Sequence, residues 1–323
     1  MNTIILIALA AGAASALMFA SIISGALISL LLFYLSPLPL IVASIAWGPL
    51  SSAIGGVAAA IGLGAIFGIP YCIAFLVMAA LPAWWLGHLV LLGRPMTEAA
   101  SGDSPAAPLP LEWYPIGRIL LWIAGFTTLA TMASLLTLGT DAATITSTMQ
   151  HNLLRDFGSI DTDSSIEDEQ WINALVNVAP AAAAIVTVLT LTISLWLGAK
   201  VTATLGRLRR PWPDLRATTL PAMTLVALSV AVAFCFSGGL LAMAAQAVAT
   251  ALTMAYAMIG FAVLHTVTLE LKSRTVWLSF AYTIVFVFSW TLVLMAALGL
   301  ADAVCGLRQR YLRSRPPPPL PAS

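Results

Sequence analysis

Three polar side chains lie inside long apolar stretches of the sequence and are the first candidates for chemistry. Gln246 and His265 belong to one such stretch, and Asn177 lies near the start of another. If these stretches lie in hydrocarbon, a polar side chain there is costly and raises a functional hypothesis by default. We interpret Gln246, Asn177 and His265 as candidate ligand-binding residues. The alternatives are an interhelical hydrogen bond for Gln246 and an interfacial cap or a headgroup contact for Asn177.

A compact group of charges around one indole is the second candidate. Arg207, Arg209 and Arg210 precede Trp212, which lies between two prolines, and Asp214 follows. Planar guanidinium groups and an indole suit anionic lipid headgroups or a protein partner. The alternative is a segment that only sets membrane topology, with the indole as an interfacial anchor.

Small residues spaced four positions apart form the third group, because they let helices pack closely in lipid. Ala10 and Ala14 form one such pair, and Gly56, Ala60 and Gly64 form a longer ridge. The chain is rich in Ala and Gly, so such spacings also arise by chance. We expect most of them to serve packing inside the protein.

Motifs of catalysis and metal binding are absent from the sequence, which contains no His-Glu-x-x-His, G-x-S-x-G or G-x-x-x-x-G-K-[ST]. The odd number and wide spacing of Cys72, Cys235 and Cys305 fit neither a disulfide framework nor a zinc site. Asp161 and Asp163 could contact a hard cation, but the order of an EF-hand is missing, which favours a solvated acidic surface. We expect no enzyme activity, no metal and no cofactor.

The composition indicates which elements must position these residues. Of 323 residues, 60% are hydrophobic and 8% are charged, and no Lys, Arg, Asp or Glu precedes Arg94. A soluble domain has about 25% charged residues, so a water-soluble globule is excluded. A net charge of +1 lacks the basic field that nucleic-acid binding requires. We predict an all-α polytopic integral membrane helical bundle whose partner is the lipid bilayer, with no nucleic-acid partner.

Uncharged stretches of sufficient length predict about eight transmembrane helices, since about 20 helical residues cross a bilayer. The predicted spans are residues 3–34, 40–66, 70–92, 119–138, 171–198, 220–236, 240–269 and 276–300. Breaks are expected at the prolines of segment 36–39 and at the glycines of segments 68–70 and 237–239. Two spans are ambiguous: 3–34 could divide near Gly25, and 240–269 could be two short or re-entrant pieces.

The charges outside these spans predict the sides of the membrane. Basic residues in segment 199–219 place it in the cytoplasm, and acidic residues dominate an external loop at 139–170. Segment 94–112 is then a flexible cytoplasmic linker. We treat 1–306 as one transmembrane domain and 307–323 as an Arg- and Pro-rich disordered tail. Three simple crossings after the basic segment would put this tail outside, against the positive-inside rule, whereas we place it in the cytoplasm.

Five segments are similar to those of a known family. They are LLFYLSPLP at 31–39, PAWWLG at 82–87, LEWYPIG at 111–117, GRLRRPWPDL at 206–215 and AYAMIGFAVLH at 255–265. The chain resembles the YybS-like family of predicted bacterial membrane proteins, in its alphaproteobacterial branch, and this implies a multi-pass protein of the bacterial cytoplasmic (inner) membrane. The family has no settled activity.

The chain also resembles, more distantly, the S components of energy-coupling-factor vitamin transporters. These helical bundles bind a micronutrient from outside and dock on a separate ATPase module. The resemblance implies a docking motif at Ala10 and Ala14, or at Ala16 and Ala20, and a separate energising partner. We therefore expect a transporter-type substrate-binding subunit for a small neutral molecule, since no buried charge stands ready for an ionic one. The alternatives are a scaffold or assembly factor that recruits a soluble protein through 206–215, and an intramembrane enzyme.

Overall fold

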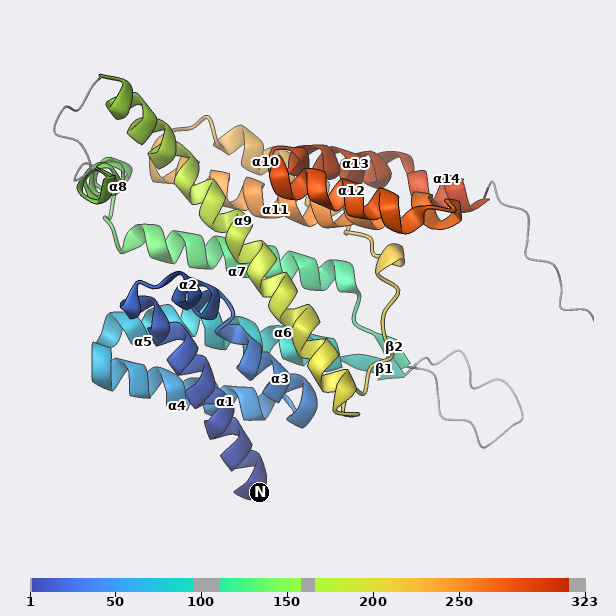
Figure 1. The fold of residues 1–323 in the computed structure, drawn as a ribbon, viewed down its shortest axis with the longest axis horizontal. Helices are drawn as coiled ribbons and strands as arrows, with labels where there is room; N and C mark the ends of the chain where they lie inside the picture. The colour runs from blue at the N-terminus through green and yellow to red at the C-terminus, as the bar shows by residue number, and fades with distance from the viewer. Residues whose placement is uncertain (1, 96–110, 158–165, 314–323) are drawn as a thin grey trace, which may run out of the picture.

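The computed structural model describes residues 2–95, 111–157 and 166–313, and these form a bundle of helices (Figure 1). Its strands are β1 (Gly93–Pro95) and β2 (Leu111–Trp113), which pair in an antiparallel hairpin. The ends of the linker predicted at 94–112 are therefore ordered, with an ion pair of 2.6 Å between Arg94 and Glu112. Its middle, 96–110, lies outside the described residues.

The first part of the chain forms closely connected helices. They are α1 (Asn2–Ala20) with the 3-10 turn η1 (Ser21–Ser24), α2 (Leu27–Tyr34), α3 (Pro37–Trp47), α4 (Pro49–Phe67), α5 (Ile69–Phe75), the π-helical turn η2 (Leu76–Ala80) and α6 (Leu81–Leu91).

The break predicted at segment 36–39 is a helix boundary, because α2 ends at Tyr34 and α3 begins at Pro37, but it does not divide two membrane spans. Residues Leu27–Trp47 form one apolar span, and Pro37 occupies the first turn of α3, where a missing N–H costs nothing. The spans divide instead at Gly25 (φ 67°), in agreement with the alternative division of 3–34, and at Gly48 (φ 101°), which was not predicted. Both backbone torsions favour glycine. The two spans predicted at 3–34 and 40–66 are therefore three.

The second part of the chain runs from α7 to α14, and α9 is its longest helix. Its elements are α7 (Ile116–Leu136), α8 (Ala142–Phe157), α9 (Ile166–Thr204), η4 (Leu215–Ala217), α10 (Met223–Phe234), α11 (Gly239–Val267), η5 (Thr268–Glu270), α12 (Arg274–Val287), α13 (Thr291–Cys305) and α14 (Leu307–Arg313).

The expected number of membrane helices is confirmed, although their identities differ. Within the described residues, seven helices are long and apolar enough to cross a membrane, or eight if the bent pair α13 and α14 counts as one. The span predicted at 220–236 contains only the short α10, and the span predicted at 276–300 breaks between α12 and α13. The span at 240–269 is not divided, because α11 is continuous through it.

The C-terminal helices return to the end of the bundle that carries the basic segment. The hydroxyl of Tyr311 donates to the carbonyl of Val267 (3.1 Å), and the guanidinium of Arg308 donates to the carbonyl of Arg216. α12 leaves this end and α13 comes back to it (Figure 1). The single crossing predicted at 276–300 is thus an outward and a returning helix. The tail predicted as disordered from residue 307 is helical up to Arg313.

Glycines set the closest helix contacts. A Cβ added to Gly12 in α1 would overlap the carbonyl of Gly55 in α4, and one added to Gly260 in α11 would overlap the carbonyl of Met295 in α13. In lipid, such small residues let two backbones approach each other.

The structure distributes the five predicted packing residues between the interior and the surface. Gly56 lies against Ala80, Gly64 lies against Cys72, and Ala60 is buried. Ala10 and Ala14 are exposed, because α1 turns its other face, with Gly12, toward α4.

Candidate functional site

Two long helices diverge toward the basic end of the bundle and leave a space between them. The amide nitrogen Nε2 of Gln246 in α11 donates to the backbone carbonyl of Asn177 in α9 at 3.2 Å, where the helices are close. From there each helix continues for nineteen residues, to Trp196 and His265, which is about 28 Å of helix. α7 lies between the diverging helices (Figure 1). The space therefore has two helical walls and a helical floor.

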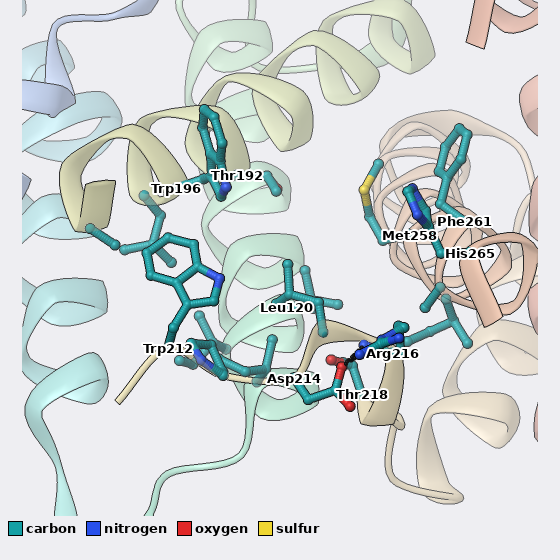
Figure 2. Close-up of a pocket in the computed structure, with 18 of the residues that line it drawn as sticks. Leu120, Thr192, Trp196, Trp212, Asp214, Arg216, Thr218, Met258, Phe261 and His265 are labelled. Atoms are coloured by element: carbon teal, nitrogen blue, oxygen red, sulfur yellow. Dashed lines mark hydrogen bonds and ion pairs between the residues drawn. The ribbon is translucent and has the colours of Figure 1, made fainter. Parts of the chain in front are cut away.

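This space is a cavity of about 740 Å³ with a mainly apolar lining. Figure 2 shows Leu120 of α7 on the floor, Trp196 of α9 on one side, and Met258 and Phe261 of α11 on the other. Further apolar lining comes from Ile119, Ile123, Leu195, Leu208 and Ile259. Ligand sites in proteins have volumes of about 300–1,000 Å³, so this cavity has room for a small organic molecule.

The basic segment after α9 forms one wall of the cavity. Arg210, Trp212, Asp214 and Arg216 all line it, and the indole of Trp212 lies 4.5 Å from the ammonium of Lys200. The carboxylate of Asp214 accepts from the backbone N–H of Arg216 at 3.1 Å and from its Nε at 3.0 Å. The hydrogen bond from the Arg216 side chain lowers the pKa of the Asp214 carboxyl most, and the hydrogen bond from the Arg216 backbone lowers it further. Asp214 and Arg216 thus neutralise each other.

Arg210 is the most buried charged residue on the cavity, with 8% of its surface exposed. Its guanidinium lies 6.0 Å from the ring of Trp113. Among the described residues, nothing forms a hydrogen bond with its Nη1. Burial lowers the pKa of this guanidinium, since desolvation disfavours the charged form.

The opposite wall carries a second polar group. The Nε2 atom of His265 lies 2.8 Å from the hydroxyl of Tyr282 in α12. The Nδ1 atom of the same imidazole lies 3.5 Å from Nη2 of Arg274. The Nε of Arg274 is buried and has no hydrogen-bond partner within the described part of the chain. All three side chains line the cavity. Cations therefore flank an apolar chamber on two sides.

The structure brings together some of the predicted site residues and separates others. His265, Arg210, Trp212 and Asp214 line the same cavity. Gln246 and Asn177 contact each other where α9 and α11 meet, which is the interhelical hydrogen bond held open above as the alternative for Gln246.

The two other arginines of the predicted group point elsewhere. The guanidinium of Arg207 lies over the ring of Trp47 at 4.9 Å, and Arg209 is exposed. The expectation that no buried charge stands ready for an ionic ligand is wrong, because Arg210 is such a charge.

The lining residues that sequence reasoning missed include Trp196, Arg216, Arg274 and Tyr282. Arg216 belongs to the predicted basic segment, and its charge was the available signal. Arg274 lies between the spans predicted at 240–269 and 276–300, and its charge was likewise the available signal. Nothing in the local sequence distinguishes Trp196 or Tyr282 from residues that face lipid.

These features define a polytopic helical membrane protein with a cavity at its basic end. Residues 13–303 match the family described as "Predicted membrane protein (DUF2232)", and the chain belongs to this family. Neither the curated proteins nor the solved structures include a match.

Proposed function

We propose that this protein is a transporter-type ligand-binding subunit of the bacterial inner membrane and that its ligand occupies the cavity between α9 and α11. The observation that carries the proposal is a chamber of about 740 Å³ bordered by α7, α9, α11 and the basic segment. Its mainly apolar lining suits a small, largely apolar molecule, because apolar surface removed from water favours binding.

The charges support a cytoplasmic opening of this cavity. The basic residues at its end of the bundle are Arg94, Arg118, Lys200, Arg207, Arg209, Arg210, Arg216, Lys272, Arg274, Arg308, Arg310 and Arg313. The opposite end carries Arg155 on α8 (Figure 1). By the positive-inside rule the basic end faces the cytoplasm. The ligand then enters from the inner leaflet or the cytoplasm, whereas an S component takes its ligand from outside.

The alternative role is a scaffold or assembly factor that recruits a soluble partner through segment 206–215. The packing of this segment favours the ligand-binding role, because Arg210, Trp212 and Asp214 line the cavity. A separate energising partner remains part of the proposal. The exposed pair Ala10 and Ala14 on α1 is where the resemblance to S components would place its docking contact.

Filling the cavity tests the proposal. Leu120→Trp adds an indole on the cavity floor, whereas Leu129→Trp adds the same group on an exposed part of the same helix. Native mass spectrometry of protein purified in mild detergent should show a retained small molecule in the wild type and in Leu129→Trp. The Leu120→Trp variant should carry no such molecule. Wild-type protein that is always empty, or a Leu120→Trp variant that retains the molecule, would count against ligand binding in this cavity.

A further inference from the structure

We infer that the ligand presents a carbonyl oxygen on a flat, unsaturated ring, and that the hydroxyl of Tyr282 donates a hydrogen bond to this oxygen. The inference rests on the proposed function and adds the chemical class of the ligand. Tyr282 selects the ligand by this hydrogen bond, and His265 is a positioning residue that directs the hydroxyl.

The contacts of His265 determine which of its ring nitrogens carries the hydrogen. Nη2 of Arg274 lies 3.5 Å from Nδ1 of the imidazole. A guanidinium group can donate a hydrogen bond but cannot accept one, so Nδ1 is the acceptor and carries no hydrogen. A second hydrogen on the ring would also place two cations side by side. The single hydrogen of the imidazole is therefore on Nε2.

This tautomer determines the direction of the Tyr282 hydroxyl. Nε2 of His265 lies 2.8 Å from the hydroxyl oxygen and donates to it. The hydroxyl has one hydrogen of its own, which must then point toward another acceptor. Among the described residues, His265 is the one hydrogen-bond partner of this hydroxyl. A donor without an acceptor in apolar surroundings is costly, and an acceptor on the ligand would remove this cost.

The position of the hydroxyl suits a ligand in the cavity. Tyr282 and His265 both line the cavity, so the hydroxyl lies where two lining residues meet. Figure 2 shows His265 on the same side of the chamber as Met258 and Phe261. Tyr282 is 44% exposed, so protein atoms leave much of its side chain open to an occupant.

The charge of Arg274 favours a strong acceptor such as a carbonyl oxygen. Consecutive hydrogen bonds polarise one another, and a cation at the start of this series makes the Tyr282 hydroxyl a better donor. Such a donor prefers an oxygen with a partial negative charge. A carbonyl oxygen provides this without adding a net charge, in agreement with the mainly apolar lining.

The aromatic side chains of the lining support a flat ring as the carrier of the carbonyl. The rings of Phe261 and Tyr282 are stacked, with centroids 5.3 Å apart and an interplanar angle of 9°. Trp196 and Trp212 line the other side of the cavity (Figure 2). Contacts between aromatic rings are favourable beyond the burial of area alone. A flat ligand ring could make such contacts with either wall.

Two probes of the same shape test the carbonyl. Menadione is a flat naphthoquinone with two carbonyl oxygens, and 2-methylnaphthalene has the same carbon skeleton without them. Equilibrium dialysis of the purified protein in detergent would measure how strongly each probe prefers the protein to protein-free micelles. This preference should be about two- to tenfold greater for menadione, the range for one net hydrogen bond.

Two tyrosines allow a matched comparison. Tyr282→Phe keeps the ring next to Phe261 and removes only the hydroxyl, so it should abolish the advantage of menadione and leave 2-methylnaphthalene binding unchanged. Tyr311→Phe makes the same change where the hydroxyl donates to the carbonyl of Val267, and it should change neither probe. His265→Phe should reduce the advantage of menadione by a smaller factor, because the hydroxyl remains but is no longer directed.

Infrared spectroscopy measures the hydrogen bond itself. Donation to a carbonyl oxygen weakens the C=O bond, so the carbonyl band of menadione should lie at lower frequency on the wild-type protein than in micelles. Tyr311→Phe should keep this shift, and Tyr282→Phe should remove it. The comparison of wild-type protein with micelles decides the question even if Tyr282→Phe does not fold.

The outcomes distinguish this inference from the proposed function. An unshifted carbonyl band on the wild type, or equal effects of Tyr282→Phe and Tyr311→Phe on menadione, would overturn the hydrogen bond from Tyr282. Equal preference for the two probes would overturn the carbonyl, and failure of both probes on a protein that retains another small molecule would overturn the flat ring. In these cases a ligand cavity remains. Failure of both probes, together with a wild type that is always empty, would overturn the proposed function itself.

Discussion

Two arginines at the basic end are similarly buried, but only one of them pairs with a carboxylate. Arg308 is 6% exposed, and its Nη2 lies 2.7 Å from the carboxylate of Asp302, which is 7% exposed. The backbone N–H of Arg308 also donates to this carboxylate at 2.8 Å. Arg210 is 8% exposed and lacks a described carboxylate partner. The charge of Arg308 is therefore balanced within the fold, whereas Arg210 is a candidate for ligand binding.

Neutralising Asp302 should destabilise the protein. Asp302→Asn leaves Arg308 buried beside a neutral group, and removing one partner of a buried ion pair costs about 3–5 kcal/mol. The midpoint of thermal unfolding in detergent should fall clearly. Asp214→Asn removes an exposed carboxylate that also pairs with an arginine, and it should produce a far smaller change. Similar losses for the two variants would show that the burial of Asp302 contributes little.

At the scale of elements, close glycine contacts join helices that are far apart in the sequence. α1 packs on α4 through Gly12 and Gly55, and α11 packs on α13 through Gly260 and Gly299. At each contact an added methyl group would overlap backbone atoms of the other helix. The second contact also holds α13 beside α11, and α13 presents Asp302 to Arg308.

Two glycines of α4 allow the cost of an overlapping side chain to be measured apart from the effect of glycine on helix stability. A Cβ on Gly55 would overlap the carbonyl of Ala8, whereas a Cβ on Gly62 would meet nothing within 4 Å. Gly55→Ala should lower the free energy of unfolding by about 1–3 kcal/mol, the usual cost of overpacking. Gly62→Ala should be neutral or stabilising by up to about 1 kcal/mol, because Ala favours a helix interior. Chemical denaturation in detergent would measure both, and equal effects would contradict the packing explanation.

At the scale of the whole molecule, the return of α13 gathers the basic residues at one end. With α12 and α13 running in opposite directions, α14 lies beside the basic segment, and Tyr311 reaches the end of α11. Lys272 and Arg274 also lie at this end, because they follow α11 directly. A single crossing at 276–300 would have left either these two residues or the arginines of α14 on the opposite side.

Cysteine labelling tests this arrangement. In a background without Cys72, Cys235 and Cys305, single cysteines would replace Ala217, Lys272 or Arg310 at the basic end, or Ser147 on α8. An impermeant maleimide added to intact cells should label only Ser147→Cys, and the other three should react only after the membrane is opened. Labelling of Lys272→Cys in intact cells would contradict this arrangement, because Lys272 and the basic segment would then lie on opposite sides of the membrane.

The sequence by itself determined the class of the protein and its helical architecture. These depend on properties of single stretches, their length, apolar composition and flanking charges, which act wherever the stretch lies in the fold. The positions of the breaks were harder to predict, because prolines in the first turn of a helix and glycines with positive φ act through local geometry. Thus segment 36–39 was predicted as a break, and Gly48 was not.

Only the tertiary structure decided where the cavity lies and which residues line it. Arg209 and Arg210 are neighbours of the same type, yet one is exposed and the other is buried against the cavity. Trp196 and Tyr282 meet the same chamber from helices that are distant in the sequence. The physical reason is that burial depends on how α7, α9 and α11 diverge, and this divergence arises from packing between segments that the order of residues does not place together.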